Sequence, residues 1–68
     1  MRKTARPKEI VLFLERHGFW FSSQKGSHAI YRHDDGRRTA VPMHSKELKK
    51  GTLHSILKDI GMTLEDLD

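Results

Sequence analysis

The chain has 68 residues, enough for one small domain. A domain of this size buries only about 60% of the surface that its unfolded chain exposes, so its stability is marginal. Because the chain has no cysteine, disulfides and thiolate metal sites are excluded as sources of stability, and a reducing compartment is compatible with this composition. The net charge is +4 at pH 7.

The charged residues are unevenly distributed. Residues 1–58 contain all 13 lysines and arginines against five acids, a net charge of +8, whereas residues 59–68 contain four acids and no base. This basic body favours a polyanionic partner such as nucleic acid, although a basic surface covered only by solvent has the same composition. The apolar run 10–14 is too short for a signal peptide or a membrane span. We therefore expect a soluble, cytoplasmic protein.

The first predicted element is a helix over residues 8–17, preceded by a loose basic extension over residues 1–6. Pro7 suits the first turn of a helix, where its missing N–H is not needed. Gly18 suits the position after the last turn, where the backbone enters the left-handed region. The residues at helical spacing are Ile10, Phe13, Leu14 and His17.

Residues 19–42 are predicted to form a three-stranded antiparallel meander. The first strand, residues 19–24, begins with three aromatic residues. We expect Phe19 and Phe21 to face the helices and Trp20 to face the other side. Trp20 is then a platform for a nucleobase, an anchor for a partner, or a partly buried edge residue.

The second predicted strand covers residues 27–33, between a turn at Lys25-Gly26 and a tight turn at residues 34–36, whose Asp-Gly pair is typical of hairpins. The third strand covers residues 37–41, and Pro42 ends it because proline cannot donate to a ladder. Alternation along the second strand places His28, Ile30 and Arg32 on one face and Ser27, Ala29, Tyr31 and His33 on the other.

A polar connection over residues 43–49 leads to a second helix over residues 50–60, which Gly61 ends. Its apolar stripe consists of Leu53, Ile56, Leu57 and Ile60. Residues 63–68 form an acidic end with a capping-box pattern and one last short turn. The order αβββα predicts a single two-layer α+β domain with its core in residues 7–62, in which two helices cover one face of the sheet and the other face is free to bind a ligand.

His28 is the centre of the candidate site. An imidazole transfers protons near neutral pH, and RNA carries a nucleophile of its own in the 2′-OH. Lysines, together with the free N–H groups at the start of the second helix, would bind phosphate there. A histidine that only binds phosphate, or that packs at the start of a strand, has the same spacing. The candidate RNA-binding residues are Lys25, Gly26, Ser27, Arg32, Lys46, Lys49 and Lys50.

The other histidines are assigned lesser roles. His44, in the loop before the second helix, is the candidate helper of His28. His17 is interpreted as a capping or surface residue, and His33 and His54 are interpreted as surface or phosphate-contact residues. Tyr31 is interpreted as a base-stacking residue or, in preference, a packing residue. No metal or cofactor is expected, because the five histidines do not form the paired helical spacing of zinc sites.

Several short segments follow one another over residues 7–62. They are Gly18-Phe19, Lys25-Gly26-Ser27-His28 with Tyr31, His33-Asp34-Asp35-Gly36-Arg37, Val41-Pro42 with His44, residues 46–53 and residues 56–58. In this order and at these spacings, the series resembles the HicA-type toxins, also called YcfA-like mRNA interferases, of bacterial and archaeal type II toxin–antitoxin pairs.

This resemblance implies a fold like that of double-stranded-RNA-binding domains and endoribonuclease activity on mRNA. It also implies that His28 is the catalytic histidine and that a HicB-type antitoxin covers the active site in a hetero-oligomer. Two alternatives come from the residues themselves. A non-catalytic RNA-binding module would have the same architecture, and a protein-interaction domain would use its basic body to bind an acidic partner.

Overall fold

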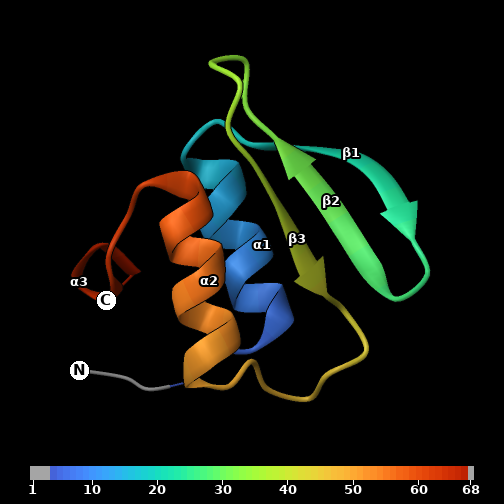
Figure 1. Ribbon diagram of the computed structural model, residues 1–68, viewed down its shortest axis with the longest axis vertical. Coiled ribbons are helices and arrows are strands. Elements are labelled where there is room, and N and C mark those ends of the chain that lie inside the picture. Colours follow the sequence, from blue (N-terminus) through green and yellow to red (C-terminus); the bar gives the residue numbers. More distant parts are fainter. Residues whose placement is uncertain (1–3, 68) are drawn as a thin grey trace.

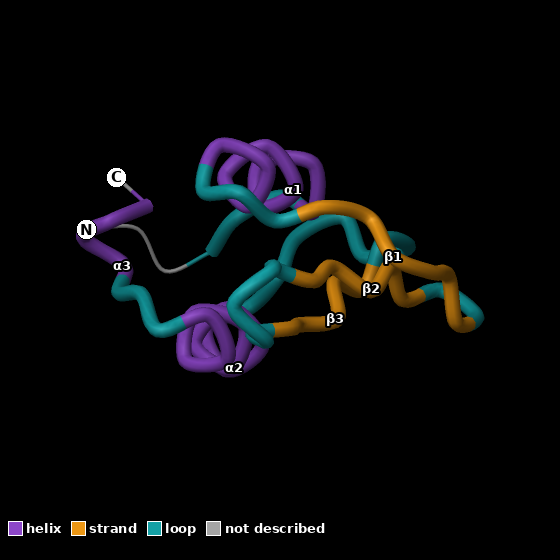
Figure 2. The backbone as a smooth tube through the Cα atoms, turned by 90° about the horizontal axis from the view of Figure 1, so that it is seen from above, coloured by secondary structure: helices purple, strands orange, loops and turns teal. Residues whose placement is uncertain are grey.

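The computed structural model describes residues 4–67. The elements are the helix α1 (Pro7–Arg16), the strands β1 (Trp20–Lys25), β2 (His28–Arg32) and β3 (Arg38–Pro42), and the helices α2 (Lys50–Ile60) and α3 (Leu64–Leu67). The strands form one antiparallel sheet in the order β1-β2-β3, and α1 and α2 lie side by side against one face of it (Figures 1 and 2). The predicted α+β fold is confirmed. Within the described residues, no helix has the length and apolar character that crossing a membrane requires.

The strand register assigns each side chain of the sheet to a face. Tyr31 pairs with Phe21 and Thr39, and Ala29 and Tyr31 belong to the core beneath the helices. Because side chains alternate along a strand, their neighbours in β2 face away from the helices. The three cross-strand rows on this open face are Trp20–Arg32–Arg38, Ser23–Ile30–Ala40 and Lys25–His28–Pro42.

The core lies between the two helices and the sheet, as the helical spacing predicts. His17, at the end of the same stripe, is exposed as expected, and its Nδ1 lies 2.8 Å from the carbonyl oxygen of Phe13. Leu48, from the connection before α2, is also buried and exchanges two backbone hydrogen bonds with Ala5. The chain is therefore packed against the fold from Ala5 onward. The prediction of a loose extension over residues 1–6 is wrong for residues 5 and 6, and residues 1–3 lie outside the described part. The buried side chains of the two helices are Ile10, Phe13, Leu14, Leu53, Ile56, Leu57 and Ile60.

Phe21 departs from the prediction that it packs under the helices. Its register with Tyr31 places it on the helix side of the sheet, and the two rings meet edge to face with centroids 5.9 Å apart. The side chain is nevertheless 53% exposed. The helices pack mainly against β3, and β1 is the strand farthest from them (Figure 2). Alternation predicted the correct face, but nothing in the structure covers this edge of it.

Gly18 follows α1 and lies close to His33, the residue after β2. Its φ is +85°, and a Cβ built there would lie 2.9 Å from the Nε2 of His33. A side chain at this position would therefore be strained in the backbone and would displace the imidazole. Gly51, in the first turn of α2, has an ordinary helical backbone and open space around it.

We expect Gly18→Ala and Gly51→Ala to change the free energy of unfolding in opposite directions. Gly18→Ala should destabilise the protein by about 1–3 kcal/mol, because it forces a side chain into the left-handed region. Gly51→Ala should stabilise it by about 0.5–1 kcal/mol, because alanine restricts the unfolded chain more than glycine does. Urea unfolding followed by circular dichroism measures both effects. Equal stability of the parent and Gly18→Ala would contradict the assigned strain.

Candidate functional site

The backbone of His28 is held on both sides while its ring remains free. His28 is the first residue of β2, and it pairs with Lys25 of β1 and Pro42 of β3. The turn before it has Gly26 at φ +59°, and the backbone N–H of Met43 donates to the carbonyl of Ser27 at 2.8 Å. The imidazole is exposed and makes no hydrogen bond or ion pair with any of residues 4–67. The position of the ring is therefore set by the sheet, and both of its nitrogens are available to a ligand.

Lys25 is the nearest cation to His28 in the sheet. Side chains directly opposite each other on one face of an antiparallel pair have Cβ atoms about 4.5–5.5 Å apart. The Lys25 side chain is exposed and forms no ion pair within the described part of the chain. The ammonium and the imidazole can therefore contact the same phosphodiester. Pro42, on the other side of His28, contributes no charge.

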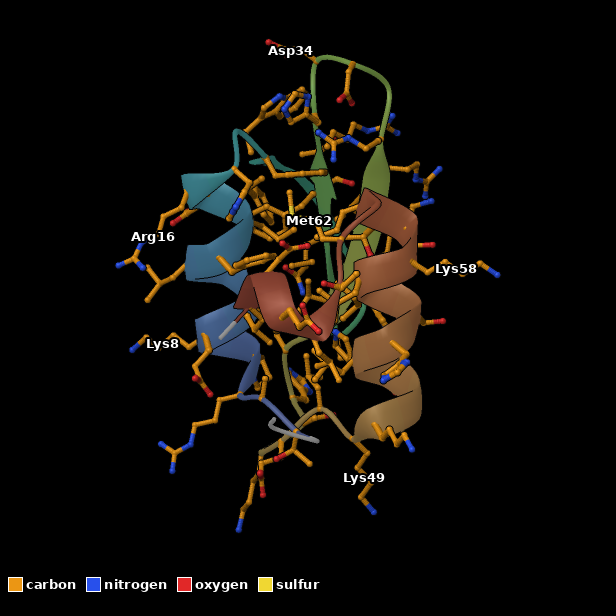
Figure 3. All side chains as sticks on the ribbon, turned by 90° about the vertical axis from the view of Figure 1, so that its left-hand side faces the viewer. Lys8, Arg16, Asp34, Lys49, Lys58 and Met62 are labelled. Atoms are coloured by element: carbon orange, nitrogen blue, oxygen red, sulfur yellow. The ribbon has the colours of Figure 1, made fainter. Side chains whose placement is uncertain are left out.

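Apart from Arg32, the remaining predicted residues belong to segments at the same end of the molecule as His28. The β1–β2 turn, the end of β3, the connection 43–49 and the start of α2 are all found there (Figure 1), and Lys49 extends from this end, opposite Asp34 (Figure 3). His44, in this connection, is exposed. Lys46 lines an open groove of about 490 Å³ with Arg6 and Glu47.

The start of α2 is positively charged. Lys49 is the N-cap, with φ −74° and ψ 168°, and Lys50 is the first helical residue. No side chain caps this end, and the first turn contains no acid. The free N–H groups of the first turn therefore add to the field of the two lysines.

Arg32 lies on the same face as His28 but at the other end of β2. The four residue steps from His28 to Arg32 span about 13 Å at the rise of an antiparallel strand. The Nε of Arg32 donates to the hydroxyl of Ser22 at 3.2 Å. Arg38 pairs with Arg32 across β2 and β3, and it is also exposed. Sequence reasoning missed Arg38 as a candidate, although pairing the strands across the turn at residues 34–36 brings it opposite Arg32.

Tyr31 and His33 are structural residues. Tyr31 is only 6% exposed and packs in the core, which agrees with packing rather than base stacking. Burial, and to a lesser extent the charge of Glu15, raises the pKa of its phenol. His33 was expected on the surface, but its half-buried ring packs edge to face on Phe19, with centroids 4.9 Å apart.

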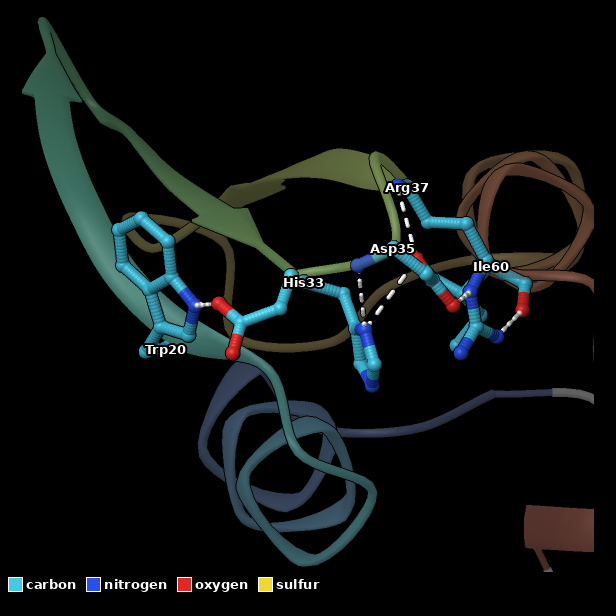
Figure 4. Close-up of polar contacts among 6 residues, drawn as sticks. Trp20, His33, Asp35, Arg37 and Ile60 are labelled. Carbon is cyan, nitrogen blue, oxygen red and sulfur yellow. Dashed lines mark hydrogen bonds and ion pairs between the residues drawn. The ribbon is translucent and has the colours of Figure 1, made fainter.

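Arg37, which is held by Asp35, fastens the β2–β3 loop to the end of α2 and to the segment after α1 (Figure 4). The Nε of Arg37 donates to Asp35 at 2.8 Å, its terminal nitrogen donates to the carbonyl of Ile60, and its guanidinium lies 5.0 Å from the centroid of Phe19. The Nδ1 of His33 lies 3.1 Å from the backbone nitrogen of Asp35. The backbone N–H and the guanidinium of Arg37 lower the pKa of Asp35, which therefore remains ionised at neutral pH.

The described residues contain no group of three or more histidine, aspartate or glutamate side chains that could hold a metal ion. The open face instead offers one free imidazole, with Lys25 opposite it on β1 and Arg32 at the other end of β2, and the basic start of α2 lies at the same end of the molecule as His28. These groups can bind a phosphodiester backbone and transfer a proton to or from it.

Comparison with known proteins identifies the family of the chain. The family model of the HicA toxin of bacterial toxin–antitoxin systems matches residues 7–62, which is most of the chain. No curated protein matches the chain. The matched region contains all of α1, the sheet and α2. The chain thus belongs to the HicA toxin family and is a toxin of a toxin–antitoxin system.

Proposed function

We propose that this toxin is an endoribonuclease that cleaves mRNA, with His28 as its proton-transfer group. The observation that carries this proposal is the free, exposed imidazole beside Lys25 on the open face of the sheet. A histidine that served only to pack or to hold the turn would be covered or hydrogen-bonded, as His33 and His17 are.

The proposed reaction is internal attack by the 2′-OH on the adjacent phosphorus. The 2′ oxygen forms a bond to phosphorus while the bond from phosphorus to the 5′ oxygen of the next nucleotide breaks. One proton leaves the 2′-OH and one is needed by the departing 5′ oxygen. His28 is general base or general acid in these transfers, and His44, exposed at the same end of the fold, is the candidate for the other.

The cations hold the substrate and stabilise the charge that develops on phosphorus. Lys25 is directly beside His28. Lys46 lies between β3 and α2, Lys49 and Lys50 lie at the start of α2, and Arg32 lies at the end of β2, so in this proposal they extend the positive surface on either side of His28 and Lys25. A strand of RNA crossing this surface has its phosphates neutralised at several points.

We further propose that a HicB-type antitoxin binds over His28 and forms a hetero-oligomer with the toxin. The membership of a toxin–antitoxin family requires a partner that restrains the toxin. Acidic side chains of such a partner would occupy the places of the phosphates on Lys25 and the neighbouring cations.

A non-catalytic RNA-binding module is the competing function. The observation in its favour is that Lys25, Arg32 and Arg38 are exposed and make no ion pair with any described acid, so the open face can bind RNA without using the imidazole. Cleavage that depends on His28 separates the two functions.

We expect His28→Ala to lower the rate of RNA cleavage by about 10²–10⁴, because a lost acid–base group typically costs this much. Its binding to RNA should remain. The measurement is cleavage of end-labelled single-stranded RNA, with His54→Ala as a matched control because His54 is an exposed histidine of α2. Full activity of His28→Ala in a preparation free of other nucleases would refute the assignment. Binding of duplex RNA without any cleavage by the parent protein would favour the non-catalytic module.

A substrate with a single 2′-deoxy nucleotide at the scissile position should resist cleavage, because it lacks the attacking oxygen. The all-ribose RNA of the same sequence is the control, and gel analysis of the products is the measurement. Efficient cleavage of the 2′-deoxy substrate would mean that water, rather than the 2′-OH, attacks phosphorus.

Lys25→Ala should weaken RNA binding and reduce its dependence on salt, because one phosphate contact is lost. The slope of log K against log salt should become shallower by about 1. The measurement is RNA anisotropy over a salt series in the His28→Ala background, where the substrate stays intact. Lys58→Ala is the control, since Lys58 lies in the last turn of α2. An unchanged slope for Lys25→Ala would remove Lys25 from the phosphate contacts.

A further inference from the structure

Trp20 is an exposed aromatic residue on the open face, at the opposite end of β2 from His28. It is the chain's one tryptophan and is 47% exposed. Its register with Arg32 and Arg38 places the three side chains in one cross-strand row. Phe21, the next residue, is about equally exposed but lies on the helix side of the sheet. The two exposed aromatics of β1 therefore belong to different surfaces.

The indole of Trp20 is oriented by a hydrogen bond at its polar edge. Its Nε1 donates to the Oδ1 of Asp34 at 3.1 Å (Figure 4). This hydrogen bond connects the first residue of β1 to the β2–β3 turn. This contact satisfies the ring N–H without covering the ring. Binding costs less conformational entropy when the ligand stacks on an aromatic side chain that is already held in place than when the side chain must first be ordered.

The two arginines beside Trp20 are exposed and free of acidic partners among the described residues. Arg32 donates to Ser22, a neutral hydroxyl, and Arg38 forms no hydrogen bond there. Arg37, between them in the hairpin, is by contrast bonded to Asp35. The charges that face the open side of the sheet are therefore available to phosphates, whereas the charge that faces the helices is used by the fold.

The cross-strand row between the two ends of this face has no charged side chain. It consists of Ser23, Ile30 and Ala40, and Ile30 is only 4% exposed although it faces away from the helices. No charged or bulky polar side chain therefore separates Arg32 from His28 along β2. An extended ligand can lie along about 13 Å of the sheet between them.

We propose that Trp20, Arg32 and Arg38 form a subsite for a flanking nucleotide of single-stranded RNA. The base stacks on the indole of Trp20, and the two guanidiniums bind phosphates between that nucleotide and the scissile one at His28. The inference rests on the proposed ribonuclease function and adds to it the part of the substrate that lies away from the reaction. Aromatic rings beside arginines are the usual platform for unpaired bases, whose faces a duplex would hide.

The intrinsic fluorescence of Trp20 tests this subsite directly, because no other tryptophan contributes to the signal. The probe is a short RNA without self-complementarity, added to the His28→Ala protein so that it stays intact. We expect single-stranded RNA to quench Trp20 and the same sequence as a duplex to quench it much less. Binding of single-stranded RNA without any change in the fluorescence would overturn the proposal.

Substitutions measure the contribution of the ring. By anisotropy of labelled RNA, also in the His28→Ala background, Trp20→Ala should bind about tenfold more weakly, and Trp20→Phe should retain most of the affinity. Phe21→Ala is the matched control and should bind like the parent, because its ring lies on the other face. Equal binding by Trp20→Ala and the parent would overturn the proposal. Because Trp20 is half exposed, circular dichroism should show that Trp20→Ala and Trp20→Phe are both folded.

Failure of the subsite and failure of the proposed function give different results. If Trp20→Ala, with His28 intact, binds and cleaves RNA like the parent while cleavage depends on His28, the subsite is wrong and the ribonuclease stands. If RNA quenches Trp20 and Trp20→Ala binds weakly but nothing is cleaved, the subsite stands and the catalytic role is wrong. If no RNA binds at all, both are wrong.

Discussion

The pairing of β2 with strands on both sides is the constraint on which the rest of the structure depends. Side chains in a strand alternate with a period of two, so a slip of one residue would turn His28 toward the helices and Tyr31 toward solvent. The burial of Ala29 and Tyr31 against the helices opposes such a slip. The helices thus keep the imidazole exposed by packing against its neighbours in β2, without touching the imidazole itself.

A second set of contacts holds the opposite end of the sheet. Asp35 and Arg37 tie the β2–β3 turn together, and Arg37 reaches the last carbonyl of α2 at Ile60. Gly18 lets the end of α1 approach His33. The low pKa of Asp35 maintains this ion pair well below neutral pH. Since Arg32 and Arg38 flank this turn, the contacts that connect the hairpin to the end of α2 and to the segment after α1 also help to fix the spacing of the two arginines.

Local patterns were enough to predict the helices, the turns and the face that carries His28. Helical spacing identified the buried stripes of α1 and α2, and the glycines marked the turns. Tertiary packing was not predictable in this way. The exposure of Phe21 depends on how far the helices reach across the sheet, and the burial of His33 depends on Phe19, a residue distant in the sequence. Arg38 was missed because its place opposite Arg32 follows from the pairing of two strands, not from either strand alone.

The cations of the sheet and of the β2–β3 loop differ in whether the fold itself neutralises their charge. Arg37 is neutralised within the fold, whereas Lys25, Arg32 and Arg38 on the open face have no acidic partner among residues 4–67. Uncompensated like charges repel one another and reduce the stability of a chain that has no disulfide. A polyanion that binds this face therefore stabilises the folded protein. RNA and an acidic antitoxin would both stabilise the fold through the same cations. Because one ligand cannot neutralise charges that the other already covers, we expect their binding to be mutually exclusive.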